Sequence, residues 1–277
     1  MEEGRGADHR RIAIEVQYDG THFNGWQIQN GRRTVQEEIE KAIRVLLKER
    51  IRIVASGRTD TGVHAIGQIA HFDTVSTIGL QRICIGLNGI LPRDISIRNA
   101  YHVHADFHAR FGAVRRSYRY LIYNHPSRTP FMQYRAMWVH EKLDVGYLRR
   151  VAALLIGEND FSSFCKKRES FKVKTVRRIT EINIRRHHDL VKVDIAGNAF
   201  LHNMVRIIVG TMIDMNKAEE SPERILDVIA RRDRVFSGKT APPYGLYLMK
   251  VMYDPDLTSM DAAFFRGMEE EGMGNNG

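Results

Sequence analysis

Residues 11–20 read RIAIEVQYDG, and this stretch begins the pattern that decides the fold. Its apolar residues recur at every second position: Ile12, Ile14, Val16 and Tyr18. Alternation of this kind is typical of a strand with one face buried, and the Asp-Gly pair that follows favours a turn. The stretch therefore predicts a half-buried strand that ends at residues 19–20.

The segments that follow alternate between helix and strand. Thr34 and Glu37 have the spacing of a capping box, and apolar residues at helical spacing come after them. Further apolar patterns predict strands over 51–55 and 66–72, a helix over 80–87 and a strand over 95–103. The order βαββαβ is that of a ferredoxin-like domain.

From about Val114 the pattern starts again. It predicts a strand over 118–122, a helix over 143–156, strands over 176–184 and 190–195, a long apolar helix over 200–215, a shorter helix from residue 221 and a strand over 245–253, with a hairpin turn at 187–189. We therefore expect an α+β fold of two ferredoxin-like domains, with antiparallel sheets facing a central cleft and an extra helix on the second domain. The predicted domains are residues 1–110 and 111–277, and the tail EEEGMGNNG is expected to be mobile.

The charge balance indicates a polyanionic partner. Lys and Arg number 42 against 33 Asp and Glu, which gives a net charge of +9 and a pI of about 9.6. A surplus of this size favours nucleic acid as a partner. Two cysteines are too few for a disulfide framework or a Cys-rich zinc site in one chain. Without an apolar leader or a run of about 18 apolar residues, we expect a cytoplasmic protein that is neither exported nor inserted in a membrane.

A glycine-rich turn carries the first candidate catalytic residue. Residues 55–65 read ASGRTDTGVHA, so Asp60 follows a predicted strand in a loop of the kind that often carries chemistry. The structural alternative is a tight turn in which Asp60 only accepts backbone N–H bonds. Asp60 taken alone does not distinguish the two interpretations.

A cation on an apolar helix is the second signal. Arg206 lies within FLHNMVRIIVG (200–210), where an unpaired charge would be costly. We expect a carboxylate or phosphate partner, and the alternative is a side chain that reaches the helix surface. Two aromatic segments, YDGTHFNGWQ (18–27) and RRSYRY (115–120), are suited to stacking on RNA. The alternatives are an ordinary ordered hairpin loop for the first and a surface strand with one core face for the second. Arg177 and Arg178 are candidate phosphate contacts, although such pairs also occur on solvated faces.

Cofactor signals are weak. His102, His104 and His108 could ligate a metal, but no cysteine or carboxylate set accompanies them. The chain has no P-loop, no dinucleotide-binding glycine motif and no HExxH. The sequence therefore predicts chemistry by side chains alone, with no metal and no cofactor.

Seven segments together resemble one family, the TruA-type tRNA pseudouridine synthases. They lie in family order between about residues 11 and 253: YDGTHFNGWQ, GRTDTGVHA, ADFHARF, RRSYRYLIYN, DFSSF, FLHNMVRIIVG and GKTAPPYGLYL. The resemblance implies isomerisation of uridine to pseudouridine in the anticodon stem-loop of tRNA, at nucleotides 38 to 40. It also implies a homodimer that needs no metal and no cofactor.

The resemblance assigns roles residue by residue. It implies that Asp60 is the catalytic nucleophile, that Arg58 assists base flipping and that Tyr118 is the active-site tyrosine. It further implies that Arg206 pairs with the aspartate and that Leu248 forms an apolar wall of the uracil pocket. Three other classes stay open on the residues alone: a tandem RNA-binding protein, a metal-dependent nuclease and a ribosome-associated structural protein.

Overall fold

The computed structural model describes residues 9–166 and 174–263, and these form two compact units. The first unit contains residues 9–59, 65–114 and 251–263, and the second contains residues 60–64 and 115–250 with the gap at 167–173. The predicted mobile tail at 269–277 lies outside the described residues. The predicted domain boundary after residue 110 and the cleft between two sheets stay predictions.

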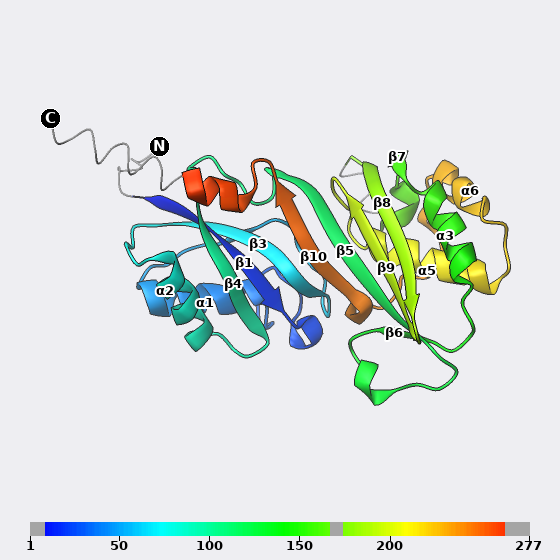
Figure 1. Cartoon of the computed structure of the whole chain (residues 1–277), viewed down its shortest axis with the longest axis horizontal. Helices are drawn as coiled ribbons and strands as arrows, with labels where there is room; N and C mark the ends of the chain where they lie inside the picture. Colours follow the sequence, from blue (N-terminus) through cyan, green and yellow to red (C-terminus); the bar gives the residue numbers. More distant parts are fainter. Residues whose placement is uncertain (1–8, 167–173, 264–277) are drawn as a thin grey trace. The chain divides into compact units, whose positions relative to one another are not determined.

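The first unit is an antiparallel sheet with helices α1 and α2 and a further helical segment at residues 257–263 (Figure 1). Its elements are β1 (Arg10–Tyr18), the 3-10 helix η1 (Gly20–His22), α1 (Val35–Leu47), β2 (Val54–Ala55), β3 (His64–Thr74), α2 (Leu80–Ile90) and β4 (Ile95–Val103). β1 lies between β3 and β4, with Ile14 opposite both Ala70 and Ala100, and β2 pairs with β3. The four apolar residues that predicted β1 are all buried, so its alternation marks the core face as expected.

Two local predictions for α1 and β2 were wrong. Thr34 is the N-cap of α1, but its hydroxyl makes no capping bond, and Glu37 pairs with Lys41 at 3.0 Å. The strand predicted over 51–55 is reduced to Val54–Ala55. Side chains of α1 replace the missing ladder bonds, because Ile53 N donates to Glu40 Oε1 (3.1 Å) and Ile53 O accepts from Gln36 Nε2 (3.3 Å).

The second unit repeats a mostly antiparallel arrangement with more elements (Figure 1). They are β5 (Ala113–Asn124), η2 (Pro130–Met132), β6 (Met137–Val139), α3 (Val145–Leu154), β7 (Gly157–Asp160), η3 (Ser162–Phe164), β8 (Val176–His187), β9 (Leu190–Gly197), α5 (Met204–Lys217), α6 (Arg224–Arg231), η4 (Arg234–Phe236), η5 (Pro243–Gly245) and β10 (Leu246–Tyr253). Strands follow the order β10-β5-β9-β8-β7, with Tyr118 of β5 opposite Ile195 of β9 and β6 parallel to β5. The predicted hairpin between β8 and β9 is confirmed, with His188 at φ 51° in its turn.

The start of α5 differs from the prediction in a way that matters for the site. Asn203 has a left-handed backbone (φ 62°), so the helix begins at Met204 and not at residue 200. Residues 200 and 201 are irregular, and residues 202–203 form a turn ahead of the helix. In the described part of the chain, no helix has both the length and the apolar character needed to cross a membrane.

Residues 238–241 lie along α5 and are held there by hydrogen bonds. Gly238 N donates to Thr211 Oγ1 (2.9 Å), Lys239 N to Asp214 Oδ2 (2.8 Å) and Ala241 N to the carbonyl of Arg206 (3.1 Å). This close approach needs a glycine on the helix, because a Cβ at Gly210 would overlap the backbone carbonyl of Lys239. Gly210 thus lets the 238–241 segment reach Arg206.

We expect Gly210→Ala to lower the free energy of unfolding by about 1 to 3 kcal/mol, because the added methyl group forces the 238–241 segment off α5. The matched control is Gly89→Ala in α2, where nothing lies within 4 Å of the new Cβ. That control should be neutral or slightly stabilising, since alanine favours a helix over glycine. Urea unfolding of both variants measures the difference, and equal stabilities would contradict this packing.

Candidate active site

Asp60 lies in a tight turn of the second unit. The amide of Val63 donates to the Asp60 carbonyl (3.1 Å), and Gly62 adopts φ +77°, where a side chain would strain the backbone. A Cβ at Gly62 would also lie 3.2 Å from Pro243 Cγ. The turn that the glycine-rich sequence predicted is therefore present, and it fixes the backbone position of Asp60.

Each carboxylate oxygen of Asp60 has its own cationic or hydrogen-bonding partner. Oδ2 lies 3.0 Å from Arg206 Nη1, and Oδ1 lies 2.9 Å from His202 Nε2. The side chains of Asp60 and Arg206 are 25% and 14% exposed, whereas His202 is 40% exposed. The arginine is thus the inner partner and the histidine the outer one, so the group opens to solvent on the histidine side.

Arg206 is held by more than its ion pair. Its Nε donates to the carbonyl of Ala241 (2.8 Å), and Nη1 also donates to Asn203 Oδ1 (2.7 Å). A half-buried guanidinium needs such partners to offset the loss of water. The carboxylate partner predicted for the cation on the apolar helix is Asp60.

The electrostatics of the group keep Asp60 ionised. Burial by itself would raise the pKa of Asp60, but the hydrogen bond and charge of His202, together with the charge and hydrogen bond of Arg206, lower it below its usual value. A carboxylate with a lowered pKa stays charged at neutral pH. It has the charge that a nucleophile or an electrostatic stabiliser needs.

Tyr118 stands beside this group on β5. Its ring packs edge-on against Phe200, with centroids 5.2 Å apart. Burial raises the pKa of Tyr118 to about 12; Arg116 acts to lower this pKa, and the charge of Asp60 adds to the rise. The hydroxyl therefore keeps its proton at neutral pH.

The aromatic loop at 18–27 does not present its rings as the sequence suggested. Tyr18, Phe23 and Trp26 are at most 4% exposed, so they belong to the core of the first unit. The Tyr18 hydroxyl bonds Thr59 Oγ1 (2.8 Å), and Trp26 N donates to the Thr59 carbonyl (3.1 Å). These residues support the residue before Asp60, and their rings are not free to stack on RNA.

The remaining predicted residues do not join the Asp60 group through hydrogen bonds or ion pairs among the described residues. Arg58 is exposed in the first unit, two positions before Asp60 in the chain. Leu248 is 1% exposed on β10, which lies beside β5. Arg177 and Arg178 are neighbours on β8 and so point to opposite faces of the sheet. In the described ranges, no three or more His, Cys, Asp or Glu residues gather as a metal site requires.

His202 is the site residue that the sequence analysis missed. The signal was present, because His202 precedes Arg206 by four positions within the same segment. The predicted helix over 200–215 hid it, since a helical His202 would lie on the apolar face. The left-handed residue Asn203 breaks that pattern and places the imidazole against Asp60.

Comparison with known proteins assigns the family. The family model described as tRNA pseudouridine synthase matches residues 14–112 and 151–254. The chain is 44% identical to tRNA pseudouridine synthase A of Bacillus subtilis over 246 residues, which cover 88% of this chain and 99% of that protein. It is 42% identical to the proteins of the same name from Methylococcus capsulatus (92% and 94% covered) and Acetivibrio thermocellus (88% and 100% covered).

These matches extend across both units and include the Asp60 turn and the start of α5. The fold and the charged group at Asp60 thus belong to an isomerase that modifies RNA. The chain is a member of the tRNA pseudouridine synthase family. The resemblance drawn from the seven sequence segments is confirmed.

We expect Arg206→Ala to raise the pKa of Asp60, because the variant removes a charge and a hydrogen bond that favour the carboxylate. His202→Gln should raise it as well, and Arg206→Lys should raise it less than Arg206→Ala. Carbon-13 NMR of labelled aspartate carboxyls against pH measures the change. The control Arg119→Ala removes one ion-pair partner of Asp194, which also pairs with Arg185, and should leave Asp60 unchanged. An Asp60 that titrates alike in Arg206→Ala and the wild type would contradict the pairing.

Proposed function

We propose that this protein converts uridine to pseudouridine in the anticodon stem-loop of tRNA, at nucleotides 38 to 40, with Asp60 as the nucleophile. Family membership supports the reaction class and the tRNA substrate. The single observation that carries the choice of nucleophile is the carboxylate of Asp60, 25% exposed and held ionised between Arg206 and His202. The choice of stem-loop rests on the resemblance of the sequence motifs.

The proposed chemistry uses the charge of Asp60 directly. The carboxylate attacks the nucleotide at C1′ of the ribose or at C6 of the uracil, and either adduct lets the bond between N1 and C1′ break. The uracil then turns and forms a new bond from C5 to C1′, and Asp60 is released. N1 takes up a proton and the proton on C5 leaves to water or a nearby base, so the product has the same atoms as the substrate and no cofactor takes part.

Arg206 and His202 have different tasks in this proposal. Arg206 is fixed by Asn203 and Ala241, so it holds Oδ2 in place throughout the reaction. His202 is the more exposed partner and pairs with Oδ1. We therefore assign attack to Oδ1, with His202 as a positioning residue that aims this oxygen at the nucleotide.

Tyr118 is proposed to pack its ring against the uracil. A phenol with a pKa of about 12 is almost wholly protonated at pH 7, so it is poorly suited to accept the C5 proton as a phenolate. Its position beside Phe200 gives it a fixed ring plane. Leu248 is proposed as the apolar wall of the same uracil site.

Arginines outside the Asp60 group are proposed to bind the RNA. The target nucleotide must leave its stack at a cost of a few kcal/mol, and the exposed side chain of Arg58 can fill the vacated space. Arg177 and Arg178 are proposed phosphate contacts, although they face opposite sides of β8 and so cannot share one phosphate. Arg178 Nε also lies 3.6 Å from Glu158 Oε2, and this carboxylate would compete with a phosphate for the guanidinium.

The fold is proposed to be a pair of ferredoxin-like domains. The strand order β4-β1-β3-β2 of the first unit is matched in the second by β10-β5-β9-β8, with α1 and α2 corresponding to α3 and α5. β6, β7 and α6 are then additions to the second domain. We also propose a homodimer in the cytoplasm, as the resemblance implies.

The test of the nucleophile is Asp60→Asn, which keeps the size of the side chain and removes its charge. With tRNA carrying tritium at uridine C5, release of label should fall by about a thousandfold or more. Asp227→Asn, exposed on α6, is the matched control and should release label like the wild type. Near-normal release by Asp60→Asn would refute the assignment, and no release by the wild type would refute the activity.

Tyr118→Phe tests whether the ring or the hydroxyl matters. If the ring packs on uracil, Tyr118→Phe should keep most of the single-turnover rate, and Tyr118→Ala should lose much of it. Loss of a proton-transfer group typically costs about 100-fold or more. A drop of that size in Tyr118→Phe would move the role of this residue to its hydroxyl.

A further inference from the structure

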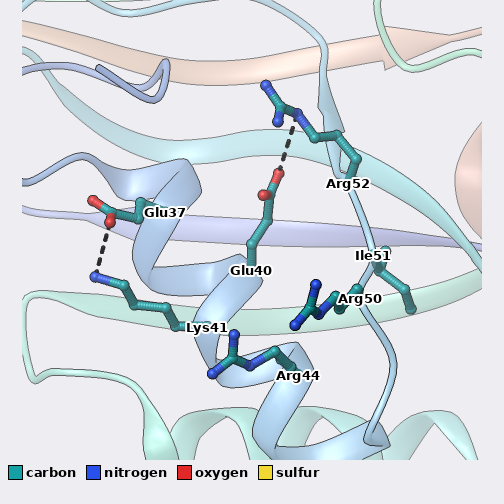
Figure 2. A pocket seen from close by; sticks show the side chains of 7 residues that line it. All are labelled: Glu37, Glu40, Lys41, Arg44, Arg50, Ile51 and Arg52. Carbon is teal, nitrogen blue, oxygen red and sulfur yellow. Dashed lines mark ion pairs between the residues drawn. The ribbon is translucent and has the colours of Figure 1, made fainter. Parts of the chain in front are cut away.

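A hollow on the first unit carries a surplus of positive charge (Figure 2). Helix α1 forms one wall and the segment before β2 forms the other, around a volume of about 330 Å³. Its lining residues are Glu37, Glu40, Lys41, Arg44, Arg50, Ile51 and Arg52. Since one liquid water occupies about 30 Å³, the hollow has room for a phosphate group with several waters.

The carboxylates around the hollow are already engaged. Glu37 lies 3.0 Å from Lys41, and Glu40 accepts a hydrogen bond from Ile53 N and lies 4.0 Å from Arg52 Nε. Glu49, next to Arg50 in the chain, bonds Thr74 and Val75 N on and beyond β3. The hollow therefore has no acidic group left to balance another cation.

Arg44 and Arg50 are the cations that remain. Both are exposed, and neither has a carboxylate partner among the residues that the structure describes. Figure 2 shows Lys41 and Arg52 joined to their carboxylates, with Arg44 and Arg50 apart from both pairs. Like charges that converge in a hollow repel each other, and an anion between them removes that repulsion.

The wall that carries Arg50 is fixed to α1. Gln36 Nε2 donates to both Glu40 Oε1 (2.7 Å) and the Ile53 carbonyl (3.3 Å), while Glu40 accepts from Ile53 N (3.1 Å). Gln36 is 3% exposed, so these bonds are shielded from water. The backbone that carries Arg50 is thus held against α1, the helix that carries Arg44, by hydrogen bonds in the interior of the unit.

We propose that Arg44 and Arg50 bind a phosphate group of the tRNA backbone in this hollow. The proposal rests on the proposed function for its choice of anion, because a tRNA-modifying enzyme meets phosphate chiefly as RNA. Guanidinium groups suit phosphate, since they present two parallel N–H donors to its oxygens. The simpler account is that Arg44 only stabilises the last turn of α1 and that both arginines are solvated.

Salt dependence of tRNA binding separates these accounts. Affinity of an unmodified tRNA transcript is measured between low and moderate salt for the wild type and Arg44→Gln/Arg50→Gln. A lost phosphate contact should weaken binding and lower the magnitude of the slope of log affinity against log salt by about one. The matched control is Arg82→Gln/Arg98→Gln, which removes two exposed arginines of the same unit outside the hollow.

A reduced slope in the hollow variant, with a wild-type slope in the control, supports the site, and Arg44→Lys/Arg50→Lys should restore most of it. A wild-type slope in the hollow variant, or an equal loss in the control, overturns the proposal. The single variants Arg44→Gln and Arg50→Gln give the same readout if the double variant unfolds. Label release by the wild type is measured in parallel, so a failure of the hollow is distinct from a failure of the proposed isomerase activity.

Discussion

The ion pair between Asp60 and Arg206 is the interaction on which the rest of the second unit's site depends. It joins the turn at residues 60–63 to the first turn of α5, and the two paired residues are 146 positions apart in the chain. Arg206 also binds Asn203 and Ala241, so one guanidinium ties together the turn, the helix start and the segment packed along the helix. Breaking such a pair would leave a half-buried charge without its counterpart, which is more costly than never having placed it there.

The same pair explains how a carboxylate can be shielded and still ionised. A carboxylate can accept about four hydrogen bonds, and the described partners of Asp60 use one position on each oxygen. Arg206 is 14% exposed and His202 is 40% exposed, so the carboxylate is more open to solvent on the histidine side. Arg206 thus helps to keep Asp60 ionised from the buried side, and the carboxylate stays partly exposed on the side of His202.

Prediction from the sequence succeeded where a single hydrophobic period, or the energetic cost of one buried charge, dominated the local structure. The period-two run at Ile12–Tyr18 gave β1 and its buried face, and the cost of a cation among apolar residues gave Arg206 a carboxylate partner. It failed where side chains replace backbone bonds or where one residue departs from the local pattern. Gln36 and Glu40 shorten the strand before residue 54, and Asn203 delays α5 and so concealed His202. The buried rings at 18–27 show that composition alone does not distinguish aromatic residues of the core from aromatic residues exposed for stacking.

Asn203 places an unusual restriction on which amino acids can stand at its position. Its left-handed backbone admits glycine and asparagine readily and aspartate less so, while β-branched residues are strongly disfavoured. Glycine would preserve the path of the chain but give up the Oδ1 acceptor of Arg206, and aspartate would set a second negative charge in competition for the same guanidinium. The residue at position 203 must therefore meet two requirements: it must adopt a left-handed backbone, and it must offer Arg206 an uncharged acceptor. Asn203 acts on Asp60 through Arg206, and few other amino acids could take its place.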